Sequence, residues 1–178
     1  MLFLIEPLRH FGCTPRDLIV ERTDEKAMRI ATALVDRTGV ALMADDFETM
    51  HRHQILPQPI ETFEGRKFVT TTEQMRRIFF SLRSHHKAMN VTHIRREVTS
   101  ARFVDAKNID TVYFSYLYSG QTLVQEPYPS YAMLRRVEGE WKFAYCMYGV
   151  TDMAAHRAAL MNVPDEVQRP PGTIGHPS

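Results

Sequence analysis

The sequence predicts one α+β domain, in which helices pack on one face of a curved, mixed and mostly antiparallel sheet. A chain of 178 residues has room for a single core of ordinary size. Apolar residues recur at helical spacing before Asn90 and alternate with polar residues after it. The alternating runs are joined by short turns, as in an antiparallel meander. Helices followed by a meander are typical of the α+β class.

The first 22 residues are expected to form an N-terminal arm. Residues 2–5 are apolar and can dock as a short strand, whereas Pro7 interrupts any helix. The helical pattern begins at Thr23, a capping residue, and continues for about five turns. Because Gly39 lies inside this helix, we expect either a kink there or the close approach of another element.

A shorter helix and two short strands are predicted next. Asp45 and Asp46 are suited to capping the helix. Pro57 and Pro59 then end the helical pattern and favour an extended backbone, so a strand begins here. A turn at Gly65 joins it to a second strand.

A second long helix is predicted from Thr70, which forms the pattern of a capping box with Glu73. Its apolar positions recur at helical spacing until Asn90, a residue that favours a helix end. His85 and His86 lie in its last turn, where a positive charge interacts favourably with the helix dipole. This position explains both histidines without a catalytic role.

Four long strands follow and form the meander, at residues 91–105, 111–119, 129–137 and 141–150. On the last of them Trp141, Phe143, Tyr145 and Met147 share one face. We expect this bulkier face to point toward the helices, which places Cys146 on the outer face. One further helix is expected at residues 153–162.

Both faces of the strand at 111–119 are partly apolar. Phe114 and Tyr116 lie on one face, and Tyr113 and Leu117 lie on the other. A sheet that is apolar on both sides needs cover on both. Helices supply one cover, and a second copy of the chain is the simplest supplier of the other. The pattern therefore predicts a homodimer through the outer face of the sheet.

This order of elements, ending in Gly139-Glu140-Trp141-Lys142-Phe143, resembles the nuclear transport factor 2-like superfamily, also called SnoaL-like. The resemblance covers residues 24–152. Leu56-Pro57 and Ile60-Glu61-Thr62, followed by Gly65-Arg66, are similar to bacterial members of unassigned function. The resemblance implies a cone-shaped domain at residues 23–152, with a cavity open at one end and a homodimer through the outer sheet face. Residues 153–178 are expected to add a C-terminal helix and a Pro/Gly-rich tail.

Ketosteroid isomerase is an enzyme of this superfamily, and its catalytic residues can be sought in this sequence. The catalytic base of that enzyme is an aspartate directly before a proline on the first strand. In this sequence the pair that resembles it in position is Gln58-Pro59. A glutamine cannot accept a proton. The protonated aspartate of that enzyme falls near Tyr131 or Met133, which cannot replace it. Isomerase chemistry by these residues is therefore not expected.

The histidines of the short helix leave two interpretations open. His51 and His53 could pair with Asp45 or Asp46 for acid–base work, or they could be exposed polar residues at a helix end. His51-x-His53 lacks a third ligand at a fixed spacing, so no metal is expected. The sequence also has no glycine-rich phosphate loop and no serine nucleophile elbow, and no cofactor is expected.

A small-molecule pocket inside the cone is the functional hypothesis that the aromatic residues favour. Buried tyrosines would line an apolar cavity with a few polar points, suited to an apolar ligand and to isomerase, cyclase or dehydratase chemistry. The alternative is a non-catalytic homodimeric interaction module with a filled cone. Whether the protein is an enzyme stays open. The residues expected to line the pocket are His51, Gln58, Phe114, Tyr116, Tyr145 and Met147.

Composition excludes several other classes. Two cysteines cannot form a disulfide framework. No apolar run is long enough for a membrane span or a signal peptide, which predicts a cytoplasmic protein without a membrane partner. Basic side chains gather between residues 66 and 102, but Arg95 and Arg96 are adjacent on a strand and point to opposite faces. A nucleic-acid partner is therefore not expected.

Overall fold

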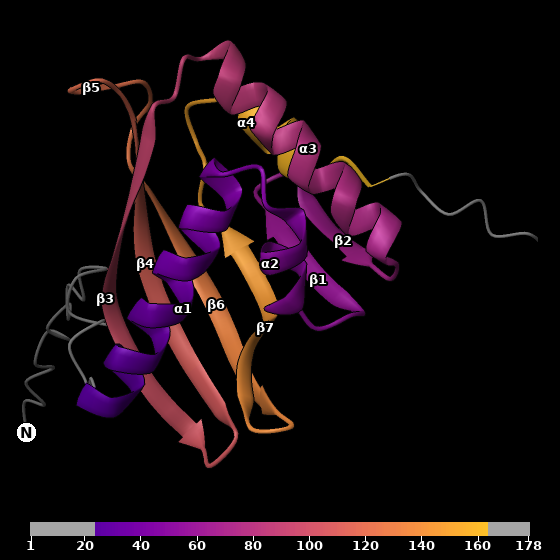
Figure 1. Ribbon diagram of the computed structural model, residues 1–178, viewed down its shortest axis with the longest axis vertical. Coiled ribbons are helices and arrows are strands. Elements are labelled where there is room, and N and C mark those ends of the chain that lie inside the picture. Colours follow the sequence, from indigo (N-terminus) through magenta and orange to yellow (C-terminus); the bar gives the residue numbers. More distant parts are fainter. Residues whose placement is uncertain (1–23, 164–178) are drawn as a thin grey trace, which may run out of the picture.

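The computed structural model describes residues 24–163, and the expected N-terminal arm and Pro/Gly-rich tail lie outside this range (Figure 1). The helices of the described part are α1 (Glu25–Met43), α2 (Phe47–Arg52), α3 (Thr72–Ala88) and α4 (Ala154–Leu160). Its strands are β1 (Gln58–Thr62), β2 (Gly65–Val69), β3 (His93–Asp105), β4 (Asn108–Ser119), β5 (Thr122–Leu123), β6 (Tyr128–Val137) and β7 (Glu140–Tyr148). No helix among residues 24–163 is long and apolar enough to cross a membrane.

One curved, unclosed sheet forms the centre of the molecule. Its strands follow the order β2-β1-β7-β6-β4-β3, and β5 pairs only with β4. Neighbouring strands are antiparallel except for β1 and β7, which are parallel. The helices pack against one side of this sheet (Figure 1). The predicted α+β class, with a mixed and mostly antiparallel sheet, is confirmed.

The long first helix begins at Asp24, which caps α1. Its Oδ1 accepts hydrogen bonds from the backbone N–H groups of Lys26 and Ala27 at 2.8 and 3.0 Å, whereas the predicted cap, Thr23, lies outside the described residues. The helix continues through Gly39 without a break, and a residue of β3 approaches it closely at this position. A Cβ atom on Gly39 would lie 3.5 Å from Cδ of Arg96, which extends from β3.

The capping box of α3 lies one residue later than predicted. Thr71 and Gln74 form it: Thr71 Oγ1 accepts from Gln74 N at 3.2 Å, and Gln74 Oε1 accepts from Thr71 N at 3.2 Å. The prediction of Thr70 with Glu73 was wrong because a glutamine amide fills the same role as a glutamate. After the helix, Asn90 takes a left-handed φ of 53°, as its position at the helix end predicts.

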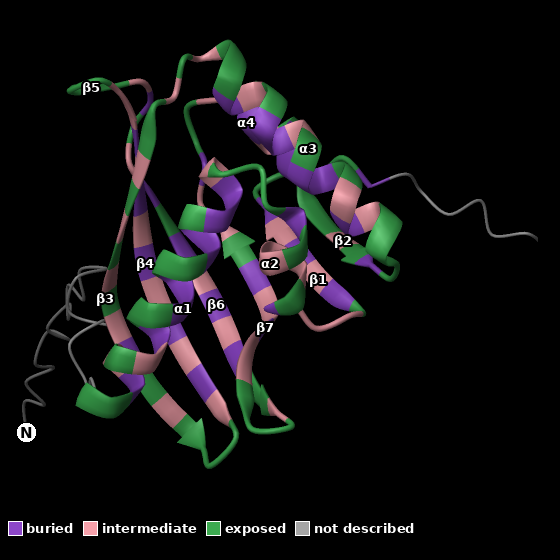
Figure 2. Cartoon of the chain, viewed as in Figure 1, coloured by how far each residue is buried: buried purple, intermediate pink, exposed green. Residues whose placement is uncertain are grey.

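Two clusters of buried side chains make up the core (Figure 2). One lies beneath α1 and includes Leu34, Ile109 and Leu134. The other lies beneath α3 and α4 and includes Phe79 and Leu160. Because Leu160 belongs to the second cluster, the described core includes part of the segment at residues 153–178.

A β-bulge divides β7 and reverses the expected orientation of its second half. Tyr145 pairs with Met133 and Phe143 pairs with Leu134, which leaves Ala144 as an extra residue. Phe143 faces the helices as predicted. Beyond the bulge, Cys146 returns to the core face and is 3% exposed, so the prediction that it lies on the outer face was wrong.

Candidate functional site

Within residues 24–163, two clusters of buried side chains fill the space between the helices and the sheet. Between α3 and the strands β1 and β7, the remaining cavity measures about 30 Å³ and is lined by apolar residues such as Ile60 and Phe79, with Gln58 as a polar neighbour. A cavity of this size holds one water molecule. Sites for small organic ligands typically measure about 300–1,000 Å³. The cavity therefore has no room for an organic substrate in this conformation.

Gln58 is the predicted site residue that does border this cavity. It is 1% exposed, and its Nε2 contacts Sγ of Cys146 at 3.5 Å. Its Oε1 is buried without a hydrogen-bond partner in the described chain. Burial raises the pKa of the Cys146 thiol to about 12, so this sulfur stays protonated and is not a nucleophile at neutral pH. The pair is a polar point in an apolar core.

His51 belongs to α2, and its side chain contacts the first residue of α3 rather than the acidic residues that precede α2. Its Nε2 lies 3.1 Å from Oγ1 of Thr72, and its ring stacks on Phe47 with 5.3 Å between centroids. Asp45 instead forms ion pairs with α3, at 2.8 Å to Nε of Arg83 and 2.9 Å to Nζ of Lys87. These contacts leave no His–Asp pair at His51.

The other four predicted site residues lie on the outer face of the sheet, away from the cavity. Phe114 and Tyr116 alternate with core residues along β4, and Tyr145 and Met147 follow the bulge in β7. The expectation that Tyr145 and Met147 face the helices was wrong. A single sequence shows the alternation of a strand, but it does not show the extra residue that shifts the alternation.

Hydroxyl groups on this outer face are held by carboxylates. Tyr145 Oη donates to Glu61 Oε2 at 2.8 Å, and Arg66 Nη2 reaches the same oxygen at 2.6 Å. The hydrogen bond from Arg66 lowers the pKa of Glu61. Tyr131 Oη likewise donates to Asp110 Oδ1 at 2.8 Å. These two tyrosine rings are therefore fixed in orientation.

A cluster of three histidines joins α3 to α4, which the sequence did not predict. His85 and His86 lie 5.1 and 5.6 Å from His156, measured between ring centroids. Burial lowers the pKa of His86 to about 2 and that of His156 to about 3. Both rings are therefore neutral at pH 7, and the explanation of His86 as a positive charge at a helix end was wrong. A signal was present, since His86 continues the apolar stripe of its helix.

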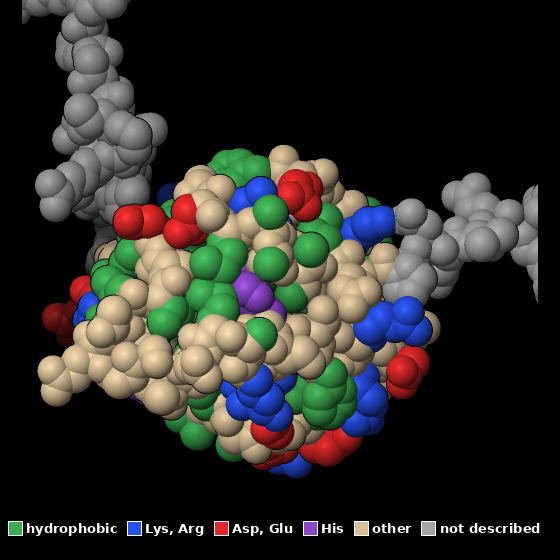
Figure 3. Space-filling view, turned by 90° about the horizontal axis from the view of Figure 1, so that it is seen from above, with side chains coloured by type: hydrophobic (Ala, Val, Ile, Leu, Met, Phe, Trp, Pro, Cys, Tyr) green, Lys and Arg blue, Asp and Glu red, His purple; other side chains and the backbone are tan. Residues whose placement is uncertain are grey.

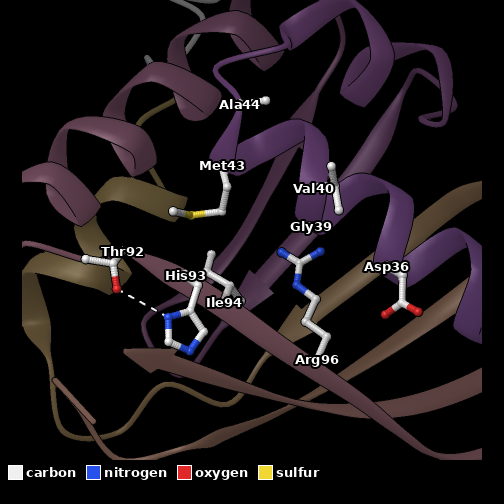
Figure 4. Close-up of a pocket in the computed structure, with 9 residues that line it drawn as sticks. All are labelled: Asp36, Gly39, Val40, Met43, Ala44, Thr92, His93, Ile94 and Arg96. Carbon is white, nitrogen blue, oxygen red and sulfur yellow. Dashed lines mark hydrogen bonds between the residues drawn. The ribbon is translucent and has the colours of Figure 1, made fainter. Parts of the chain in front are cut away.

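An open cleft of about 640 Å³ lies between α1 and the first residues of β3 (Figure 4). Val40 and Met43 form its helical wall, and Ile94 and Arg96 form its strand wall. This cleft is separate from the interior cavity, since the two share no lining residue. Among residues 24–163, no group of three or more His, Cys, Asp or Glu side chains is placed to hold a metal ion.

Comparisons with known proteins identify a shared fold and no activity. No family model and no curated protein matches the sequence. An NTF-2 like protein of unknown function from Shewanella oneidensis is 7% identical, with a TM-score of 0.55 over 68% of this chain and 98% of that one. A domain of unknown function with a cystatin-like fold, from Nostoc punctiforme, is 13% identical, with a TM-score of 0.57 over 78% and 86% of the two chains.

A ketosteroid isomerase-like protein from Erwinia carotovora is 11% identical, with a TM-score of 0.52 over 71% of this chain and 97% of that one. At such low identity the likeness concerns the backbone arrangement alone. The order of helices and strands, the curved unclosed sheet and these structural neighbours agree with one another. The chain therefore has the nuclear transport factor 2-like fold.

Proposed function

We propose that the protein is a non-catalytic interaction module that works as a homodimer, with two copies joined through the outer faces of their sheets. The observation that carries this proposal is the filled cone, whose cavity of about 30 Å³ admits no organic substrate. A pocket of the isomerase, cyclase or dehydratase type would require the side chains around Gln58 to move apart. That residue also lacks the acid–base chemistry that such reactions need.

The outer face has the composition of a protein interface. Its central residues are aromatic or contain methionine, which are side chains enriched at interfaces. Met147 is 40% exposed, although it lies on a central strand of the sheet. Tyr131 and Tyr145 pack edge to face with 5.8 Å between centroids, and their hydroxyls are already bonded. Binding a partner would therefore cost little side-chain entropy at these rings.

Charges on the same face are suited to a second copy of this chain. Glu61 and Arg66 form one ion pair on this face, and Asp110 and Arg102 form another. In a two-fold dimer each patch meets the same patch of its partner, so a surface with both signs can match itself. A partner with a strongly basic or strongly acidic surface would not match this mixture of charges.

Sedimentation equilibrium of the full chain tests the dimer. We expect a mass of twice 20.6 kDa at micromolar concentration, and a shift to the single-chain mass in Met147→Glu, because the new charge would be buried at the interface. Phe80→Glu is the matched control. Phe80 is 45% exposed on α3, which covers the opposite side of the sheet, so this variant should stay dimeric. A monomeric wild type, or a Met147→Glu variant that remains dimeric, would contradict the proposal.

A further inference from the structure

The cleft between α1 and β3 has the size and lining of a small-ligand site. Its volume of about 640 Å³ lies within the range of such sites. Val40 is 69% exposed, although its side chain is apolar, and Met43 and Ile94 add further apolar surface. Figure 4 shows these side chains bordering the space in front of Arg96.

Arg96 places a positive charge in this cleft. Its Nη1 donates to the Val35 carbonyl and to Thr38 Oγ1, both at 3.3 Å. Its Nε is buried and has no hydrogen-bond partner in the described chain. No carboxylate of residues 24–163 forms an ion pair with this guanidinium. Guanidinium groups bind carboxylates through charge-assisted hydrogen bonds, and a partly buried one gains most from such a partner.

Gly39 lets α1 lie close to the guanidinium of Arg96. A Cβ atom at this position would lie 3.6 Å from Nη1 and 3.7 Å from Nε of Arg96. Any longer side chain would therefore lie over the charged group. The absence of a side chain lets the guanidinium border the cleft beside the helix backbone.

The remaining polar residues of the cleft restrict the ligand to one anionic group. Asp36 lines the same cleft but forms no ion pair with Arg96, so its carboxylate would repel a second negative charge. Thr92 and His93 contact each other, with 3.2 Å between Oγ1 and Nδ1, and His93 also stacks on Tyr118. Arg96 is thus the charged anchor that the cleft offers.

We propose that this cleft binds a small amphipathic monocarboxylate, with the carboxylate on the Arg96 guanidinium and the apolar body against Val40, Met43 and Ile94. The proposal goes beyond the dimer, because α1 and the cleft lie on the side of the sheet opposite to the outer face. Either proposal can fail without the other.

A nuclear magnetic resonance titration of the full ¹⁵N-labelled chain tests the cleft. Octanoate serves as the probe, and octan-1-ol and octylamine serve as matched probes without the carboxylate. We expect octanoate to shift the amide signals of Val40, Met43 and Ile94 in a saturable manner. The other two probes should bind about tenfold more weakly, since they lack the charge-assisted pair. Equal binding of all three probes, or shifts confined to the outer face, would overturn the proposal.

A pair of matched variants separates the cleft from general surface effects. Val40→Glu places a negative charge beside the proposed carboxylate and should weaken octanoate binding about tenfold or more. Val104→Glu makes the same change near the other end of β3, where the side chain is 56% exposed, and should bind octanoate as the wild type does. Both positions are exposed, so both variants should fold. Octanoate binding unchanged in Val40→Glu contradicts the proposal.

Two further outcomes would also overturn it. Suberate has the same chain length as octanoate and a second carboxylate, so it should bind more weakly because of Asp36. Suberate binding as tight as that of octanoate would show that the cleft does not select one anionic group. In the ligand-free chain, nuclear Overhauser contacts between the Val40 methyl groups and residues 1–23 would show that the protein fills the cleft with its own N-terminal segment.

Discussion

His86 of α3 packs edge to face against His156 of α4, with 5.6 Å between the ring centroids and 84° between the ring planes. Both side chains are fully buried. His156 Nδ1 lies 2.9 Å from Gln125 Oε1, whereas the two ring nitrogens of His86 have no hydrogen-bond partner in the described chain. In the view from above, hydrophobic side chains surround one histidine on the surface, which is distinct from this buried pair (Figure 3). Two neutral imidazoles thus join two helices of the core.

This pair predicts that acid destabilises the protein well before its carboxylates titrate. The pKa of His86 falls to about 2 and that of His156 to about 3 in the folded chain, because burial disfavours their charged forms. Both pKa values are near 6.5 when the chain is unfolded. The unfolded state therefore binds more protons below pH 6.5, and the free energy of unfolding falls by about 1.4 kcal/mol per pH unit for each histidine. From pH 7.5 to pH 5 the loss is about 4 kcal/mol for the pair.

Urea unfolding at pH 7.5, 6 and 5 measures this loss. Burial also lowers the pKa of half-buried His85, which adds to the same trend. His93→Gln is the control, since His93 is exposed on β3 and lies outside the cluster on α3 and α4. Equal free energies of unfolding at pH 7.5 and pH 5 would show that the pair is not buried as described.

A second prediction concerns the unpartnered oxygen of Gln58. Gln58→Met replaces a buried amide with an apolar side chain of similar length, and it removes Oε1, which has no hydrogen-bond partner. We expect the free energy of unfolding to rise by about 1 kcal/mol. Gln125→Met is the matched control, because Gln125 bonds to His156 and its loss should be destabilising. If Gln58→Met is destabilising instead, the amide makes a polar contact that the core requires.

A third prediction follows from the bulge at Ala144, which turns Cys146 into the core. In a Cys13→Ser variant, Cys146 is the single thiol of the chain. Burial raises its pKa to about 12, so the native thiol should react with Ellman's reagent at pH 8 at least about a hundredfold more slowly than the unfolded thiol. Rapid reaction in the native state would place Cys146 on the outer face after all.

The parts of this fold that the sequence predicts are those that depend on neighbours along the chain. Asn90 ends α3 because its own backbone tolerates a left-handed φ, and the meander follows from alternation within each strand. The bulge at Ala144 and the burial of His156 depend instead on segments that are distant along the chain. The bulge exists only when β7 is aligned with β6, and His156 is buried only because α4 packs on α3. Filling of the cone likewise depends on how two clusters of side chains meet in space.

A fourth prediction links the stability of α1 to the proposed cleft. Gly39 has no positive φ, so the helix does not need glycine there. A Cβ atom would meet Arg96 at 3.5 Å, an ordinary van der Waals distance. Gly39→Ala should therefore raise the free energy of unfolding by about 0.5–1 kcal/mol, the usual gain in a helix interior. The added methyl group also covers one face of the guanidinium, so octanoate should bind more weakly.

The two effects together distinguish a functional glycine from a tolerated one. Urea unfolding gives the change in stability, and the octanoate titration gives the change in affinity. Thr32→Ala is the control, because it also raises helix propensity on α1 but lies outside the cleft, so it should bind octanoate as the wild type does. A stabilised Gly39→Ala variant with weaker octanoate binding means that the helix gives up stability to keep the guanidinium open. A stabilised variant with unchanged binding would show that the carboxylate does not approach Arg96 from the helix side.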